Sequence, residues 1–303
     1  MEWLLLVLSI LLGAGKSVLS KSVNLNGGGL KQTMKANTIL FSFAFCFVGV
    51  FVFFSVKEWN LPWLLVIAYA VCVLFSQISL MKAVEWGSVA ISSLFYSCGF
   101  MIPTIWGCIY FKEGINVLHV IGILLILISF VCSVERKKSE KFNAKWLIAA
   151  LGGTLFSGLV GVIQKLFGGL PTTYSLDLFL FASFAVIIVL SGITYCIYLV
   201  KDKLKKNEKE VVESENTTKL NKPTALLFMV LLGVVMGGIN KLNTYLAGVL
   251  PSVIMFPSTN GGVIVAAAIF SAVIFKEKLS KKQIVSILIG FIAIIIIAIG
   301  QNI

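Results

Sequence analysis

Ten long apolar runs constrain this chain of 303 residues more than any other feature. A bilayer core about 30 Å thick is crossed by about 20 helical residues, and backbone groups in lipid must be hydrogen-bonded inside their own segment. The runs therefore predict an all-α polytopic membrane protein with ten transmembrane helices. The predicted helices cover residues 3–22, 38–56, 62–82, 87–111, 116–134, 145–167, 175–200, 223–247, 251–275 and 282–300.

Composition excludes a soluble protein. Hydrophobic residues make up 58% of the chain and charged residues 13%, and the mean hydropathy is +1.00; soluble domains have about 45–50% and about 25%. A net charge of +12 would suggest nucleic acid in a soluble chain, but here most lysines lie at the ends of apolar runs, as topology determinants do. We expect the lipid bilayer, and no nucleic acid, as the partner.

Two segments of the chain match and end in the same three residues. Phe111-Lys112-Glu113 and Phe275-Lys276-Glu277 each close an apolar run, 164 positions apart, and Ser88 falls on Ser252 at that offset. Because each half would hold five helices, an odd number, the second half must enter the membrane in the opposite sense, as inverted repeats do. The predicted units are a first five-helix repeat over 1–135, a cytoplasmic linker over 136–144 and a second five-helix repeat over 145–303.

The basic residues predict an orientation. Connections on one side of the membrane carry 20 Lys and Arg residues, whereas the opposite side has only Lys57 and Lys112. The positive-inside rule places the first side in the cytoplasm and both termini outside it. The expected location is the cell membrane, crossed many times.

The sequence resembles a known family on the strength of particular residues. Pro103 lies in the fourth helix ahead of Phe111-Lys112-Glu113, Gly122 lies in the fifth, and the second half runs from Pro251-Ser252-Val253 to Phe275-Lys276-Glu277-Lys278-Leu279-Ser280. In these features the chain is similar to the drug/metabolite transporter superfamily, in particular to bacterial EamA-type transporters. The resemblance covers nearly the whole chain. It implies a permease of the bacterial inner membrane, with a central cavity between the two halves and alternating access.

Lys16 is the most expensive residue in the sequence to place in lipid. It lies about 20 Å along the first helix, too deep for easy snorkelling. A central lysine costs roughly 2.5–3.5 kcal/mol on translocon scales, which favours a buried partner or a water-filled cavity. We interpret Lys16 as a cavity-facing substrate residue, with structural pairing or snorkelling as the alternative.

Further polar residues inside the apolar runs are candidate substrate contacts. Gly238-Ile239-Asn240-Lys241 is similar to a substrate motif of nucleotide-sugar transporters, and the polar run after Pro257 predicts a broken or closely packed segment that lines the cavity. Hydrogen bonding or packing between helices explains the same residues without a ligand. The predicted substrate-binding residues are Lys16, Gln77, Gln164, Asn240, Lys241, Asn243, Ser258, Thr259 and Asn260.

Acidic residues and histidine are missing from the middle of the runs. Glu113 and Asp177 lie at helix ends, and the single histidine, His119, lies near a helix start. This excludes the clustered groups that enzymes use for metal or acid–base chemistry, so we expect no enzyme activity, no cofactor and no metal. The lysines inside the runs have no evident acidic partner, which favours a substrate that brings the negative charge.

These observations favour a secondary transporter of small metabolites, such as amino acids or other organic anions and zwitterions, with drugs as further candidates. Export is favoured over uptake on the resemblance alone. The alternatives are a membrane-embedded enzyme, a channel, or a transporter for multidrug efflux or uptake. Small-residue faces such as Gly233 with Gly237 leave open a homodimer. The sequence leaves open the substrate, the direction and the coupling ion.

Overall fold

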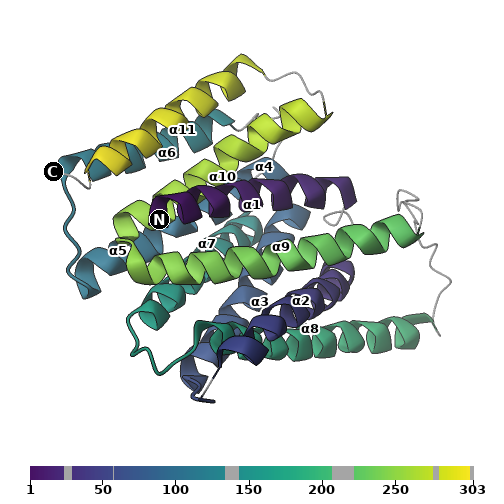
Figure 1. Cartoon of the computed structure of the whole chain (residues 1–303). Helices are drawn as coiled ribbons and strands as arrows, with labels where there is room; N and C mark the ends of the chain where they lie inside the picture. The colour runs from purple at the N-terminus through teal and green to yellow at the C-terminus, as the bar shows by residue number, and fades with distance from the viewer. Residues whose placement is uncertain (24–28, 57, 134–142, 207–221, 276–279, 301–303) are drawn as a thin grey trace.

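The computed structural model describes residues 1–23, 29–56, 58–133, 143–206, 222–275 and 280–300, and every regular element in these ranges is a helix (Figure 1). The elements are α1 (Glu2–Val23), α2 (Gly29–Ser55), α3 (Trp63–Trp86), α4 (Val89–Ser97), the 3-10 helix η1 (Cys98–Phe100), α5 (Met101–Tyr110), α6 (Val117–Ser133), α7 (Ala144–Gly168), α8 (Leu176–Lys206), α9 (Lys222–Val249), α10 (Ser252–Phe275) and α11 (Lys281–Gly300).

Each of the ten predicted segments contains a helix of the structure. Within the described ranges, nine helical spans are long and apolar enough to cross a bilayer, and α6 is apolar but shorter, with 17 residues. The all-helical class predicted from the apolar runs is thereby confirmed. The repeat residues 276–279, and all of the predicted linker except 143 and 144, lie outside the described residues.

The helix starts follow local capping rules. At the start of α11, the Ser280 amide donates to Gln283 Oε1 at 2.9 Å and the Gln283 amide donates back to Ser280 Oγ at 3.3 Å. Asn143 accepts from the Trp146 amide at 2.7 Å at the start of α7. Such caps satisfy N–H groups that have no partner within the helix.

The fourth and the ninth predicted segments are both helical throughout. Residues 89–110 run through α4, one 3-10 turn and α5 as a single helical span, and α10 continues through Pro257. The prediction of a break after Pro257 is wrong because a proline removes only one helix hydrogen bond, which a packed membrane helix tolerates. The close approach predicted there is present, since a side chain on Gly262 would crowd Ile10 of α1 at 2.6 Å.

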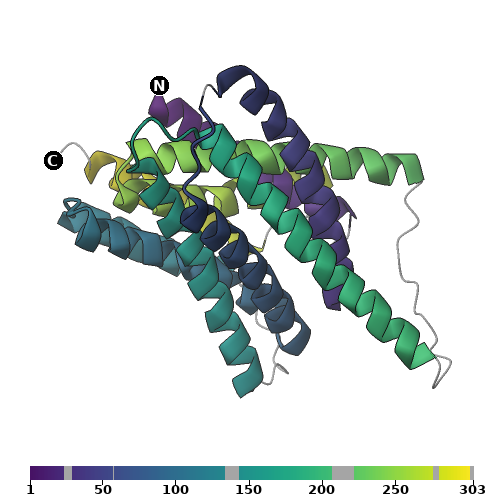
Figure 2. The same ribbon diagram turned by 90° about the horizontal axis from the view of Figure 1, so that it is seen from below.

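The two larger apolar cores among the described residues share one element. One core lies among α2, α3, α7, α8 and α9, and the other lies among α1, η1, α6, α9, α10 and α11. Figures 1 and 2 show α9 between these two groups. Because α9 contributes to both cores, polar residues on its faces can reach both halves of the chain.

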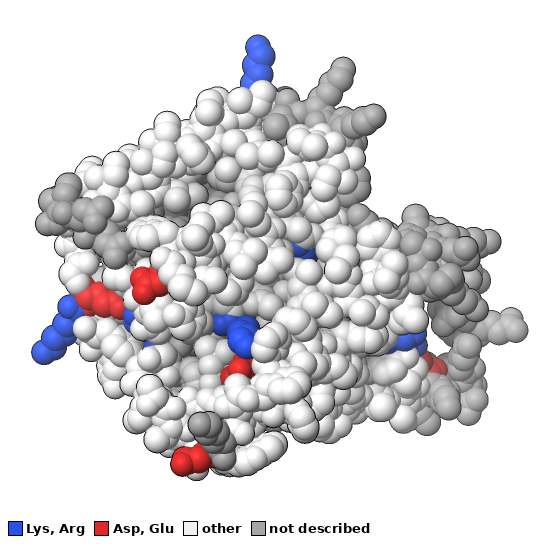
Figure 3. Space-filling view, in the orientation of Figure 1, with Lys and Arg blue, Asp and Glu red and all other residues white. Residues whose placement is uncertain are grey.

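The bundle has two distinct ends. The start of α1 and the end of α11 lie at one end in Figure 1, which we call the termini end, and the end of α8 and the start of α9 lie at the other, which we call the linker end. Charged side chains are sparse on the face shown in Figure 3, where one blue group lies recessed among white atoms. The few charges inside the bundle therefore stand out.

Candidate functional site

α9 carries three polar side chains that each bond to a different helix. Asn243 Oδ1 accepts from the Ser9 hydroxyl of α1 at 2.5 Å, and Asn240 Oδ1 accepts from the Tyr69 hydroxyl of α3 at 2.6 Å. The third side chain is Thr244, whose hydroxyl accepts from the Gln164 amide of α7 at 3.3 Å. Together they form what we call the polar layer: Ser9, Tyr69, Gln164, Asn240, Asn243 and Thr244.

The polar layer lies near the termini end. At a rise of 1.5 Å per residue, its members are about 6–14 Å from the ends of their helices. Tyr69 is fully buried and Gln164 is 5% exposed. The layer's side-chain bonds join α1, α3, α7 and α9, which is the interhelical alternative left open by the sequence. Substrate contact by Gln164, Asn240 and Asn243 remains a prediction.

Lys241 points away from the polar layer and has an acidic partner. Its ammonium lies 2.7 Å from Asp177 Oδ1 at the start of α8 and 3.6 Å from the centre of the Phe51 ring of α2. Asp177 also accepts from the Ser55 hydroxyl at 3.0 Å. The side chains of Lys241 and Asp177 are 30% and 12% exposed. This group closes the termini end between α2, α8 and α9.

Lys165 is paired more deeply. Its ammonium lies 2.6 Å from Glu113 Oε1 and donates to the Leu250 carbonyl at 2.9 Å. Glu113 Oε2 accepts from the Ser252 amide, the first of α10, at 2.6 Å. The expectation that the lysines inside the apolar runs have no acidic partner is therefore wrong for Lys165 and Lys241. Their partners lie at helix ends far away in the sequence.

Lys16 differs from both. It lies deep among the helices and is still partly accessible, which requires space beside it. Within the described residues its ammonium makes no hydrogen bond and no ion pair. Lys16 follows Ser9 by seven residues, so it lies on nearly the same face of α1 and about 10 Å further from the termini end. The cation therefore lies beyond the polar layer, on its linker side.

Residues of α3 and α4 lie at about the same depth. Ser76 follows Tyr69 by seven residues, again about 10 Å along the helix, and its Oγ lies 3.5 Å from the Tyr96 hydroxyl. Gln77 is partly exposed, and its amide makes no hydrogen bond within the described residues. In those residues α1 makes no extensive contact with α3 or α4. We take Lys16, with Gln77 and Tyr96 at about the same depth on other helices, as the candidate site.

The predicted residues of α10 do not join this site through hydrogen bonds. The Thr259 hydroxyl donates to the Met255 carbonyl at 2.8 Å, and the Asn260 amide donates to the Phe256 carbonyl at 3.0 Å, both in the same helix. Ser258 is fully buried, and its hydroxyl has no hydrogen-bond partner in the structure. A lining role for these residues remains a prediction.

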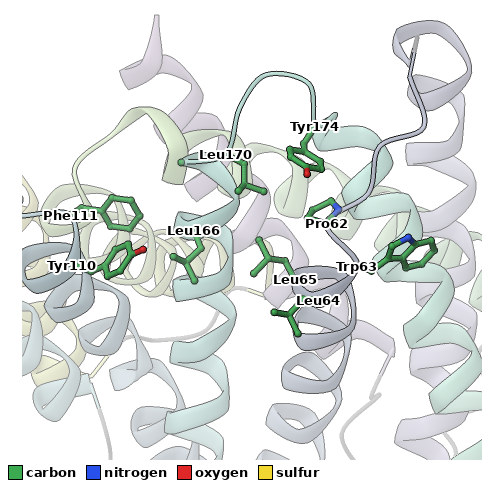
Figure 4. Close-up of a pocket in the computed structure, with 10 residues that line it drawn as sticks. Pro62, Trp63, Leu64, Leu65, Tyr110, Phe111, Leu166, Leu170 and Tyr174 are labelled. Atoms are coloured by element: carbon green, nitrogen blue, oxygen red, sulfur yellow. The ribbon is translucent and has the colours of Figure 1, made fainter.

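A separate pocket opens at the termini end between α3, α5 and α7 (Figure 4). Its volume is about 480 Å³, within the range of small-molecule sites. Its walls are mainly apolar, and it lies nearer the termini end than Lys16 does. The lining residues are Pro62, Trp63, Leu64, Leu65, Tyr110, Phe111, Leu166, Gly169, Leu170 and Tyr174.

Sequence reasoning missed the partners that complete these contacts. Ser9, Tyr69 and Tyr96 are single polar residues in apolar runs, which rarely distinguish a contact from chance. Glu113 could have been found, because it belongs to the repeated Phe-Lys-Glu motif. Among the described residues, no group of three or more His, Cys, Asp and Glu side chains could hold a metal ion.

Comparison with known proteins shows the fold alone. One solved structure, named only as "Crystal structure of protein", is similar to this chain with a TM-score of 0.73 over 99% of this chain and 97% of that one, at 14% sequence identity. No family model matches the sequence. No curated protein matches it.

Proposed function

We propose that this chain is a secondary transporter of the drug/metabolite type, which moves small organic anions or zwitterions across the cell membrane by alternating access. In this proposal residues 1–135 and 145–303 are inverted five-helix repeats, and substrate binds between them at Lys16. Export is favoured over uptake, on the sequence resemblance. The duplicated Phe-Lys-Glu segments support the repeat, and the apolar helices support a multi-pass location.

The observation that carries the proposal is the ammonium of Lys16, which has no hydrogen-bond or ion-pair partner within the described residues. The sequence places three lysines well inside apolar runs, and the structure gives acidic partners to Lys165 and Lys241. A lone charge at membrane depth is costly and marks a substrate pathway by default. A carboxylate or phosphate of the substrate would supply the missing partner, while Gln77 and the Tyr96 hydroxyl offer neutral hydrogen-bonding groups at the same depth.

Thermal stabilisation in detergent tests this proposal first. A ligand that binds only the folded state at 100 times its Kd stabilises it by about 2.7 kcal/mol. We expect stabilisation by one class of anionic or zwitterionic metabolites, lost in Lys16→Ala. The matched control is Lys145→Ala, which removes one positive charge from an exposed position at the start of α7. Stabilisation that Lys16→Ala retains in full, or that only cations and apolar drugs produce, contradicts the proposal.

Flux through proteoliposomes then separates a carrier from a channel. A stabilising compound should move with a saturable rate and be accelerated by the same compound on the opposite side, because an alternating-access carrier returns faster when loaded. Flux that rises without saturation and shows no such acceleration would identify a channel instead.

A further inference from the structure

We propose that α5 is a gate for the termini end, held closed in this structure by the Glu113–Lys165 ion pair. This inference rests on the proposed function, because alternating access requires that each end open and close in turn. We call the gate's contacts the Glu113 latch: the side chains of Glu113 and Lys165, the Leu250 carbonyl and the Ser252 amide.

The latch joins the two halves of the chain at one buried point. Glu113 follows α5 in the first half, and Lys165, Leu250 and Ser252 belong to the second. The paired side chains are 9% and 13% exposed. One carboxylate thus holds the end of α5 against α7 and against the start of α10.

The backbone delivers this carboxylate by an unusual turn. Lys112 is the only non-glycine residue with a positive φ among the described residues, at 53°. This left-handed conformation ends α5 and turns the chain so that Glu113 points back between the helices. The Phe-Lys-Glu motif of the first half therefore has a structural meaning: Phe111 lines the pocket, Lys112 makes the turn and Glu113 forms the latch.

The closed α5 packs closely against α7 and the start of α10. A side chain at Gly107 would collide with Ser252, and one at Gly158 would crowd Ile102 at 2.6 Å. Small residues let neighbouring helices approach closely in this way. Near the same end, Gly168 and Gly248 bring α7 and α9 into backbone contact. These close contacts belong to the closed state that the latch holds.

α5 has a hinge at one end and free space beside the other. The 3-10 turn η1, Cys98–Phe100, separates α5 from α4, and a 3-10 stretch inside a helix often marks a hinge. At its far end, Tyr110 and Phe111 border the pocket of about 480 Å³ that separates α5 from α3 (Figure 4). A short helix with a 3-10 turn behind it and a cavity beside its tip can swing once its tip is released.

An ion pair suits a contact that opens and closes better than one that is permanent. Replacing a buried ion pair by apolar residues is often neutral or stabilising, so permanent closure does not require charges. Separating the two charges while either stays buried is strongly unfavourable, so the free energy of the closed state differs clearly from that of any half-open state. The same pair can reform when the end closes.

Spin labels at two exposed positions of the termini end test the gate. Tyr110→Cys at the tip of α5 and Val249→Cys at the end of α9 are labelled in a background without the native cysteines, and the distance distribution is measured without substrate. Glu113→Gln should keep the hydrogen bond from the Ser252 amide and lose only the ion pair. We expect a longer-distance population that rises about tenfold or more over the unmutated latch.

Three controls make the outcome decisive. Glu85→Gln breaks the exposed Lys82–Glu85 pair of 2.7 Å and should leave the distances unchanged. Lys165→Gln breaks the latch from its other side, and hydrogen exchange of the α5 amides in the native-cysteine chain gives a second readout, also expected to rise about tenfold. Unchanged distances and exchange in folded Glu113→Gln and Lys165→Gln overturn the gate. The distance and exchange measurements use no substrate. If they change as expected while the protein transports nothing, only the proposed function is contradicted.

Discussion

Lysines at the termini end of the bundle have carboxylate partners, whereas the lysine in the middle of α1 has none within the described residues. At the termini end, Lys165 and Lys241 lie 2.6 and 2.7 Å from carboxylates. In α1, Lys16 also lies deep among the helices but is partly accessible, and it makes no ion pair within the described residues. The comparison teaches that depth alone does not define a functional lysine: the connections between helices decide which charges are already satisfied.

Removing one member of the deepest pair should have the largest effect. We expect Lys165→Met to lower the free energy of unfolding by about 3–5 kcal/mol, because it leaves Glu113 charged and buried without its partner. Thermal and SDS unfolding in detergent measure the loss. The double variant Glu113→Gln/Lys165→Met should recover most of it, since no lone charge remains. Equal losses in the single and double variants would show that the charge is not the cause.

Replacing Lys16 by Met should change the free energy of unfolding in the opposite direction. We expect Lys16→Met to raise the free energy of unfolding by about 1–3 kcal/mol without ligand, because a central lysine costs roughly 2.5–3.5 kcal/mol in an apolar segment. The unfolding measurements of the previous comparison apply, with Lys145→Met as the exposed control. A loss comparable to that of Lys165→Met would reveal a structural partner and end the contrast between the two lysines.

Breaking the partly exposed Asp177–Lys241 pair should change the free energy of unfolding by an intermediate amount. Asp177→Asn removes the carboxylate from Lys241, which is 30% exposed and can recover part of its hydration. We expect a loss of about 1–2 kcal/mol, between the values of exposed and buried pairs. Phe51→Leu, which removes the ring 3.6 Å from the ammonium, should cost about 0.5–1 kcal/mol. The contrast in burial is refuted if Asp177→Asn is as damaging as Lys165→Met.

The neutral contacts of the polar layer should matter least. Ser9→Ala removes the hydrogen bond of 2.5 Å between α1 and α9, and hydrogen bonds between membrane helices average about 0.6 kcal/mol. Ser17→Ala is the matched control, because the Ser17 hydroxyl donates to Gly13 of its own helix at 3.0 Å. If the two variants lose the same stability, the bond does not hold α1 against α9.

The helices were predictable, whereas most of the site was not. Apolar length and the backbone's need for internal hydrogen bonds determine where helices form, so the ten predicted segments match helices of the structure. The boundaries differ where a helix continues beyond the membrane-length run: α2 begins at Gly29, before the predicted start at residue 38. The 3-10 turn at Cys98–Phe100 was not predicted, and the break expected after Pro257 is absent because α10 continues through that residue.

For the site, the sequence identified the right kinds of residue and misjudged their surroundings. Lys165 and Lys241 were expected to lack acidic partners because no carboxylate lies in the middle of an apolar run. The structure places Glu113, from the connection after α5, beside Lys165, and Asp177, at the start of α8, beside Lys241. Asn240 and Asn243, three residues apart on one helix, bond to α3 and α1 respectively. A helix face predicted from spacing does not reveal which neighbour it meets.

The sequence by itself determined that this chain forms apolar helices with few charges among them, because lipid tolerates little else. Only the tertiary structure decided which of those charges are neutralised. An ion pair forms where two side chains come within about 4 Å, and the packing of helices far apart in the chain sets that distance. It brought carboxylates to Lys165 and Lys241, and within the described residues it left Lys16 without one.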